Sequence, residues 1–113
     1  MANIYDHAYD LEKALRESSE FQSLKQRYED IKKDEVANRM FENFRNLQME
    51  LQEKQMQGIQ ITEEDAQKAQ QQMQLVQQHD KISKLLEAEQ RLSVVVQDMN
   101  RIITKPLEDL YGK

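Results

Sequence analysis

The two histidines, His7 and His79, are the first residues to consider for chemistry, because imidazole exchanges protons near neutral pH. His79 is followed by Asp80, and a histidine beside a carboxylate could act as a general base. The same pair fits a helix junction at which Asp80 caps the next helix, with Ser83 three residues on. Neither histidine has a second histidine or a cysteine at metal-ligand spacing. We therefore predict a capping junction, and neither a catalytic pair nor a metal site.

Three consecutive acidic residues, Glu63, Glu64 and Asp65, are the other candidates for chemistry. Such a trio could bind a metal ion or take part in acid–base catalysis. Negative charge is also common in the first turn of a helix, where it meets the positive end of the helix dipole. Thr62 stands at the N-cap position before the trio, and Gly58 stands where the preceding helix needs a left-handed residue. The pattern favours a corner between two helices over a catalytic or metal site.

The composition gives little support to covalent catalysis. The chain contains no cysteine, which excludes disulfides, thiolate nucleophiles and iron–sulfur clusters held by thiolates. With two histidines in the chain, there are few ways to assemble a serine–histidine triad by folding. We predict that the protein is not an enzyme and binds no cofactor.

The charge pattern bears on partners. The net charge is −5, and the only adjacent basic pair is Lys32-Lys33, so the basic patch of a phosphate-backbone binder is missing. The longest aliphatic run, Val94 to Val96, is far shorter than the ~20 residues of a membrane span. The first residues lack the basic start and apolar run of a secretory signal. We expect a cytoplasmic protein that binds neither membrane nor nucleic acid directly.

Apolar residues recur at steps of three and four along most of the chain, which is the spacing of one helix face. Asn3 is expected to cap the first helix, Ser19 and Gln22 to form a capping box for the second, and Pro106 to end the fifth or open a final turn. The spacing predicts a first helix with apolar positions from Ile4 to Leu15 and a second with apolar positions from Phe21 to Ile31. Three more helices are expected over about residues 35–57, 63–78 and 80–104.

These helices predict an all-α fold in a single domain over residues 1–113. Few glycines and prolines interrupt the chain, and good helix formers dominate it. We expect an antiparallel bundle of about five helices with coiled-coil-like packing. The two long helices, about 35–57 and 80–104, should be its backbone because they are similar in length and the fourth helix turns the chain between them.

Glu89 departs from the pattern, because it occupies a position of the fifth helix at which its neighbours are aliphatic or methionine. A buried carboxylate needs a donor, and Arg45, beside Phe44 on the third helix, is a candidate, as is Arg91. A buried Glu89–Arg45 pair would fix the register of the helices. The alternative is that the helix turns Glu89 to the surface.

A partner interface is predicted near the glycine corner. Met49 and Met56 lie off the apolar face of the third helix, and exposed methionine is typical of adaptable protein contacts. With Ile59 and Ile61 they could form an apolar patch for a second copy or another protein. Core packing of the same residues is the alternative.

Three stretches resemble a known family: the run FENFRNLQMELQEKQMQG over 41–58, Ile61-Thr62, and AEQRLS over 88–93. They are similar to the YlbF/YmcA family, and most similar to its YheA branch. The resemblance implies an all-helical fold, association with copies or sister proteins, and no known enzymatic activity. Better-studied branches support competence, biofilm formation and sporulation through a complex linked to mRNA processing. Those branches carry cysteines associated with iron–sulfur clusters, and this chain has none.

The residues and the resemblance together predict a helical interaction protein that forms a homodimer or binds another helical protein. An accessory role in bacterial RNA processing or developmental regulation is the alternative, and an enzyme ranks third. Salt separates the first two, because RNA binding weakens steeply with ionic strength and an apolar interface does not.

Overall fold

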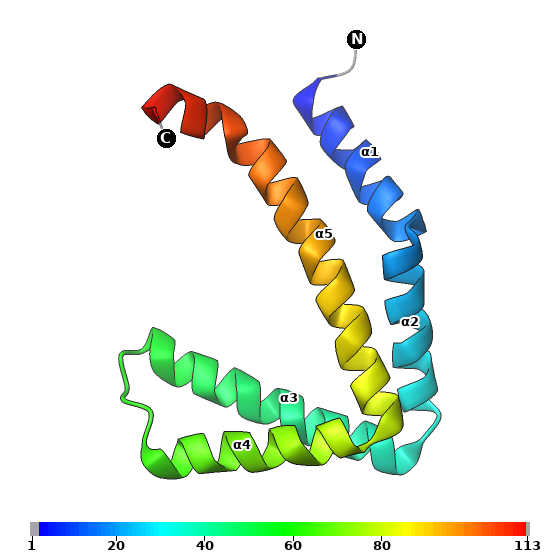
Figure 1. Ribbon diagram of the computed structural model, residues 1–113, viewed down its shortest axis with the longest axis vertical. Helices are drawn as coiled ribbons and strands as arrows, with labels where there is room; N and C mark the ends of the chain where they lie inside the picture. The colour runs from blue at the N-terminus through cyan, green and yellow to red at the C-terminus, as the bar shows by residue number, and fades with distance from the viewer. Residues whose placement is uncertain (1–2, 113) are drawn as a thin grey trace. The chain divides into compact units, whose positions relative to one another are not determined.

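The computed structural model describes residues 3–112, which form five α-helices and no strand (Figure 1). The prediction of an all-α fold with about five helices is confirmed. The helices are α1 (Ile4–Glu17), α2 (Ser19–Lys32), α3 (Glu35–Met56), α4 (Glu63–Gln78) and α5 (Asp80–Tyr111).

The chain divides into two compact units. Unit 1 combines Met1–Gln26 with Leu86–Lys113, and unit 2 is Arg27–Leu85. The boundaries fall inside α2 and α5, so both helices contribute residues to each unit. The single domain over residues 1–113 and the backbone role of the two long helices stay predictions.

Unit 2 contains most of the buried apolar side chains. Its α3 and α4 run side by side, joined by the segment around Gly58 (Figure 1). The buried residues of α3 are spaced three and four apart, so they lie on one helix face. Fully burying a side chain of this size contributes about 1.5–3 kcal/mol. The core of unit 2 consists of Ile31, Ala37, Phe41, Phe44, Val76, Ile82 and Leu85.

The junction between α1 and α2 lies one residue earlier than predicted. Ser18 has an extended backbone, and its Oγ accepts a hydrogen bond from the Phe21 N–H at 3.2 Å. Ser19 is already the first residue of α2, so the predicted capping box of Ser19 and Gln22 is wrong. The Gln22 side chain instead donates to the Arg16 carbonyl at 2.7 Å. Two adjacent serines offer similar caps, and the backbone conformation decides between them.

Helix α5 is longer than predicted, because it continues through Pro106 to Tyr111. A proline removes one backbone hydrogen bond of a helix and crowds the preceding turn. Around Pro106 the helix is exposed, and the Lys105 Nζ to Asp109 Oδ1 ion pair at 3.1 Å spans the proline. The prediction that α5 ends near residue 104 is therefore wrong. Gly112, with φ of 75°, follows the helix as its left-handed terminator.

Candidate protein-interaction surface

Helix α1 of unit 1 is well capped at its start. The Asn3 Oδ1 accepts hydrogen bonds from the N–H groups of Tyr5 at 2.9 Å and Asp6 at 3.0 Å. The Asp6 Oδ2 accepts one from the Asn3 N–H at 3.3 Å, which completes a capping box. The predicted Asn3 cap is confirmed.

The same helix is poorly covered within unit 1. None of its residues is buried, and Ile4 and Tyr5 are 78% and 72% exposed. Its apolar residues nevertheless follow the three-four spacing of a helix that packs on a partner. The sequence specifies an apolar face on α1 that unit 1 leaves open.

The C-terminal half of α5, also in unit 1, repeats this exposure. Every described residue from 101 to 112 is exposed, whereas Ala88, near the start of the α5 segment of unit 1, is buried. Burial therefore falls along α5 toward its C-terminal end. The exposed large apolar residues on the unit 1 segment of α5 are Val94, Val96, Ile102, Ile103, Leu107, Leu110 and Tyr111.

The two open faces border one hollow, which we call the α1/α5 groove. It has a volume of about 390 Å³, and residues of α1 and α5 line it. Glu12 is the one charged residue in its lining. The groove residues are Ala8, Leu11, Glu12, Ala14, Leu15 and Ser18 from α1, and Val95, Val96, Met99, Asn100 and Ile103 from α5.

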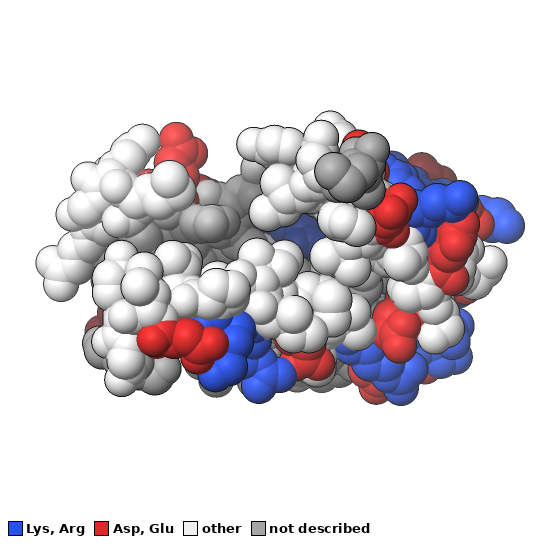
Figure 2. Space-filling view, turned by 90° about the horizontal axis from the view of Figure 1, so that it is seen from above, with Lys and Arg blue, Asp and Glu red and all other residues white. Residues whose placement is uncertain are grey.

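Charged side chains on these helices pair along their own helix. Glu12 binds Arg16 at 3.2 Å, and Asp98 pairs with Arg101. In Figure 2 uncharged residues, drawn white, cover much of the view, and many Lys, Arg, Asp and Glu residues lie toward its right and lower edges. Exposed pairs of this kind contribute little to stability. Apart from Glu12, the lining of the groove is uncharged.

The interface predicted from the sequence lies in unit 2. Met49, Met56 and Ile59 are exposed, Met56 most of all at 81%, and Ile61 is partly buried. These residues are accessible, and their role as an interface stays a prediction. The α1/α5 groove was missed because an apolar helix face has the same sequence pattern whether it is covered or open.

The predicted pair of Glu89 and Arg45 also stays a prediction. Glu89 is partly buried in unit 1, and Arg45 belongs to unit 2, where it is exposed. The Arg45 guanidinium lies over the Phe41 ring, 5.1 Å from its centre, which is the geometry of a cation–π contact. Arg45 therefore covers one side of a core aromatic residue.

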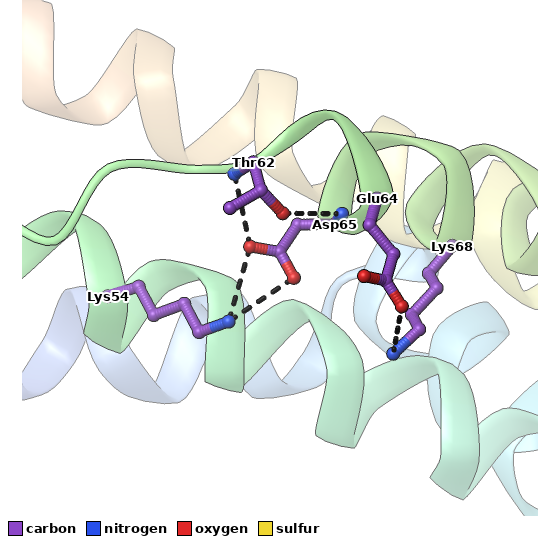
Figure 3. Close-up of polar contacts among 5 residues, drawn as sticks. All are labelled: Lys54, Thr62, Glu64, Asp65 and Lys68. Atoms are coloured by element: carbon purple, nitrogen blue, oxygen red, sulfur yellow. Dashed lines mark hydrogen bonds and ion pairs between the residues drawn. The ribbon is translucent and has the colours of Figure 1, made fainter.

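The acidic trio forms the predicted corner (Figure 3). The Thr62 Oγ1 accepts a hydrogen bond from the Asp65 N–H at 3.1 Å, and the Asp65 Oδ2 accepts one from the Thr62 N–H at 3.2 Å. Gly58 has φ of 75°, the left-handed conformation predicted for it. The Thr62 cap and the Gly58 terminator are both confirmed.

Asp65 is also bound by Lys54 of α3, whose Nζ lies 3.2 Å from both carboxylate oxygens. The hydrogen bond from the Thr62 backbone, and then Lys54, hold the pKa of Asp65 below its ordinary value. Glu64 pairs with Lys68 along α4 at 3.7 Å (Figure 3). Two of the three carboxylates thus have partners in the corner itself.

His79 lies at the junction of α4 and α5. The backbone N–H of His79 donates to the Val76 carbonyl at 3.2 Å, and the backbone carbonyl of His79 accepts from the Ser83 backbone N–H at 2.9 Å. The predicted junction is confirmed, but His79 rather than Asp80 precedes the first turn of α5, because Asp80 is already helical.

Asp34 is a second carboxylate that joins elements of unit 2. Its Oδ1 caps α3 by accepting from the Ala37 N–H at 3.1 Å, and its Oδ2 binds the Lys81 Nζ at 3.0 Å. The hydrogen bond from Ala37, and then the one from Lys81, lower the pKa of Asp34. This carboxylate therefore links the start of α3 to the start of α5 within unit 2.

Residues 3–112 contain neither a candidate metal site nor a membrane-spanning helix. No three histidine, cysteine, aspartate or glutamate side chains are grouped so that they could hold a metal ion. No described helix is both long and apolar enough to cross a membrane.

Sequence comparison places the chain in a family of helical proteins. Residues 4–108 match the family described as "Control of competence regulator ComK, YlbF/YmcA", so the chain belongs to this family. It is similar to the UPF0342 protein of Alkalihalophilus pseudofirmus, with 67% identity, covering 99% of this chain and 95% of that one.

Solved structures of relatives share the fold. A protein of unknown function (DUF964) from Bacillus stearothermophilus has a TM-score of 0.87 and 42% identity, covering 96% of this chain and 95% of the other. YheA from Bacillus subtilis has a TM-score of 0.77 and 49% identity, covering 97% and 100%. The resemblance to the YheA branch is thereby confirmed.

A more distant structure shows the fold alone. Bacillus subtilis RicA, solved in complex with RicF, has a TM-score of 0.65 and 17% identity, covering 97% of this chain and 96% of the other.

Proposed function

We propose that this protein acts by assembly and not by catalysis: it binds an apolar helical surface of another protein, or of its own kind, in the α1/α5 groove. Other members of the chain's own family are candidate partners. A role as an accessory subunit of a regulatory assembly would follow from such binding.

The observation that carries this proposal is the open apolar face on two helices that border one groove. An apolar surface of this kind is costly to leave in water, at about 25 cal/mol for each Å² that a partner could cover. Large exposed apolar patches with a polar rim mark protein interfaces. The groove has one charged lining residue, Glu12, so its walls suit an amphipathic helix better than a polar ligand.

The comparisons support this proposal at the level of the fold. RicA was solved as a complex with a second protein, RicF, which shows that a chain of this fold enters a hetero-complex. The family description, control of a competence regulator, is consistent with a protein that works through partners.

Photocrosslinking in living cells tests the proposal. A photoreactive amino acid replaces Met99, which lines the groove, and in a matched chain it replaces Gln97, an exposed residue of the same helix outside the lining. We expect protein adducts of defined mass from position 99 and few from position 97. Equal adducts from both positions, or adducts that ribonuclease digests and protease spares, would refute the proposal.

A further inference from the structure

Helix α3 carries two methionines outside the core of unit 2. Met49 and Met56 are seven residues apart, which is about two turns, so they lie on the same side of the helix. The buried Phe41 and Phe44 lie on another side, and Met49 and Met56 are 64% and 81% exposed. Packing within unit 2 therefore does not account for either methionine.

Ile59 extends this apolar surface around the end of α3. Its N–H donates to the Lys54 carbonyl at 2.8 Å, which is the bond that closes a helix whose terminator is a left-handed glycine. This bond brings the chain back beside the last turn of α3, and Ile59 remains 50% exposed there. We call Met49, Met56 and Ile59 the corner patch.

The corner patch lies in a strongly acidic part of the chain. Of the 21 acidic and 16 basic residues of the chain, five acidic residues and one lysine lie within residues 46–65. This stretch of 20 residues has a net charge of −4, and the rest of the chain has −1. Most of the net charge of the protein is therefore concentrated around the corner of unit 2.

The fold accounts for only part of this charge. Asp65 caps α4 and binds Lys54 (Figure 3). Glu50 and Glu53, by contrast, lie in the last two turns of α3, where the helix dipole disfavours negative charge. Neither forms an ion pair with another described residue. These two carboxylates lower the stability of α3, and a basic partner would offset that effect.

We propose that the corner patch docks a basic amphipathic helix of another protein. The apolar face of that helix would cover the two methionines and Ile59, and its lysine or arginine side chains would lie beside Glu50, Glu53 and Glu63. Methionine suits this role because its flexible, polarizable side chain adapts to apolar faces of different shapes. An amphipathic helix held by its apolar face is a recurrent mode of recognition. The corner patch belongs to unit 2 and the α1/α5 groove to unit 1, so this is a second site that goes beyond the proposed function.

The charge around the corner patch decides its occupant. Nucleic acids carry negative charge, which this surface repels. A two-fold symmetric contact between two corners would bring together two stretches of −4 each, and like charges across an interface are unfavourable. A basic helix supplies apolar contact and opposite charge together.

Fluorescence anisotropy with the full chain tests the proposal. The probe is a labelled peptide of about 18 residues, or five turns, with leucines at three-four spacing and lysines elsewhere. A matched peptide has glutamate in place of each lysine. We expect the lysine peptide to bind at least about tenfold more tightly than the glutamate peptide, and to bind more weakly as salt screens the charges. Equal affinity for the two peptides would overturn the proposal.

The methionines are tested by Met49→Gln/Met56→Gln, which should weaken binding of the lysine peptide by at least about tenfold. Val36→Gln is the matched control, because Val36 is also 64% exposed on α3 and lies about 20 Å along the helix from Met49. It should leave the dissociation constant within about threefold of wild type. Equal weakening by both variants would overturn the corner patch as the binding site.

The carboxylates are tested by Glu50→Gln/Glu53→Gln/Glu63→Gln, which should weaken the lysine peptide by about tenfold. A control variant changes the net charge by the same amount and should bind within about threefold of wild type. It removes three exposed glutamates elsewhere: Glu17→Gln, Glu29→Gln and Glu108→Gln. Equal weakening would show attraction by overall charge alone and would contradict a specific site.

Val96→Gln, in the lining of the α1/α5 groove, separates this inference from the proposed function. It should leave the affinity for the lysine peptide within about threefold of wild type. If Val96→Gln abolished peptide binding and the methionine variant did not, the peptide would occupy the groove; this inference would fail and the proposed function would stand. Equal crosslinking from positions 99 and 97, with peptide binding at the corner patch intact, would refute the proposed function alone.

Discussion

Replacing Thr62 with alanine tests the corner that positions α4 against α3. The change removes the Oγ1 that accepts the Asp65 N–H at 3.1 Å and leaves that donor without its acceptor. The return bond, from the Thr62 N–H to the Asp65 carboxylate, remains because it uses the backbone. Losing such a cap costs about 0.5–2 kcal/mol, and the surviving bond places the expected loss near 1 kcal/mol.

A loss of that size is measurable in a chain of 113 residues. It corresponds to a fall in melting temperature of about 4–8 °C for a domain of this size. Circular dichroism at 222 nm measures that melting temperature. Urea titration gives the free energy of unfolding directly, and an unchanged slope would show that the folded state is intact. Thr62→Ser retains the hydroxyl and should remain close to wild type.

Two results would refute this reasoning. If Thr62→Ala melted like wild type, the side-chain cap would contribute nothing and the Lys54–Asp65 contact would hold the corner alone. If Thr62→Ser were destabilised as much as Thr62→Ala, the methyl group and not the hydroxyl would be responsible.

Four further predictions follow from the same structure. Phe44→Ala should lower the free energy of unfolding by about 3–5 kcal/mol because Phe44 is buried in unit 2, whereas Asn43→Ala on the exposed side should change it little; equal urea midpoints would contradict this. Asp34 and Asp65 have lowered pKa values in the folded chain. The stability that they contribute is therefore present above the ordinary pKa of 3.8 and is lost as the pH falls through the lower pKa values of the folded state. The melting temperature of an Asp34→Asn/Asp65→Asn variant should fall less on acidification than that of wild type. Gly58→Ala should cost about 1–2 kcal/mol through its left-handed backbone alone, because nothing lies within 4 Å of the added Cβ, and Gly112→Ala at the end of α5 should cost less in the same unfolding assay. Glu89→Leu should retain the fold and loosen the specificity of assembly, and unchanged oligomeric state and melting would dismiss the buried pair with Arg45.

The sequence by itself determined where most helices begin and end. Asn3, Thr62 and Gly58 were predicted correctly because each acts within its own turn: a side chain accepts from an N–H two or three residues away, or a glycine takes a left-handed conformation. The three-four spacing on α3 likewise predicted the face that carries Phe41 and Phe44.

Where two local solutions were close in energy, the folded backbone decided between them. Ser18 caps α2 in place of Ser19, and α5 continues through Pro106 because an exposed helix tolerates one lost hydrogen bond when the turns on both sides remain intact. Sequence patterns predict the tendency of each residue, and they do not rank neighbouring alternatives.

The state of the apolar faces was decided by tertiary structure alone. Leu11 and Phe44 each lie on a helix face whose apolar residues recur at steps of three and four. Phe44 is nevertheless buried, and Leu11 is exposed. Periodicity records which side of a helix is apolar, and burial depends on what other segments reach that side. The open α1/α5 groove is therefore a property of folded unit 1, because the other residues of that unit do not cover it.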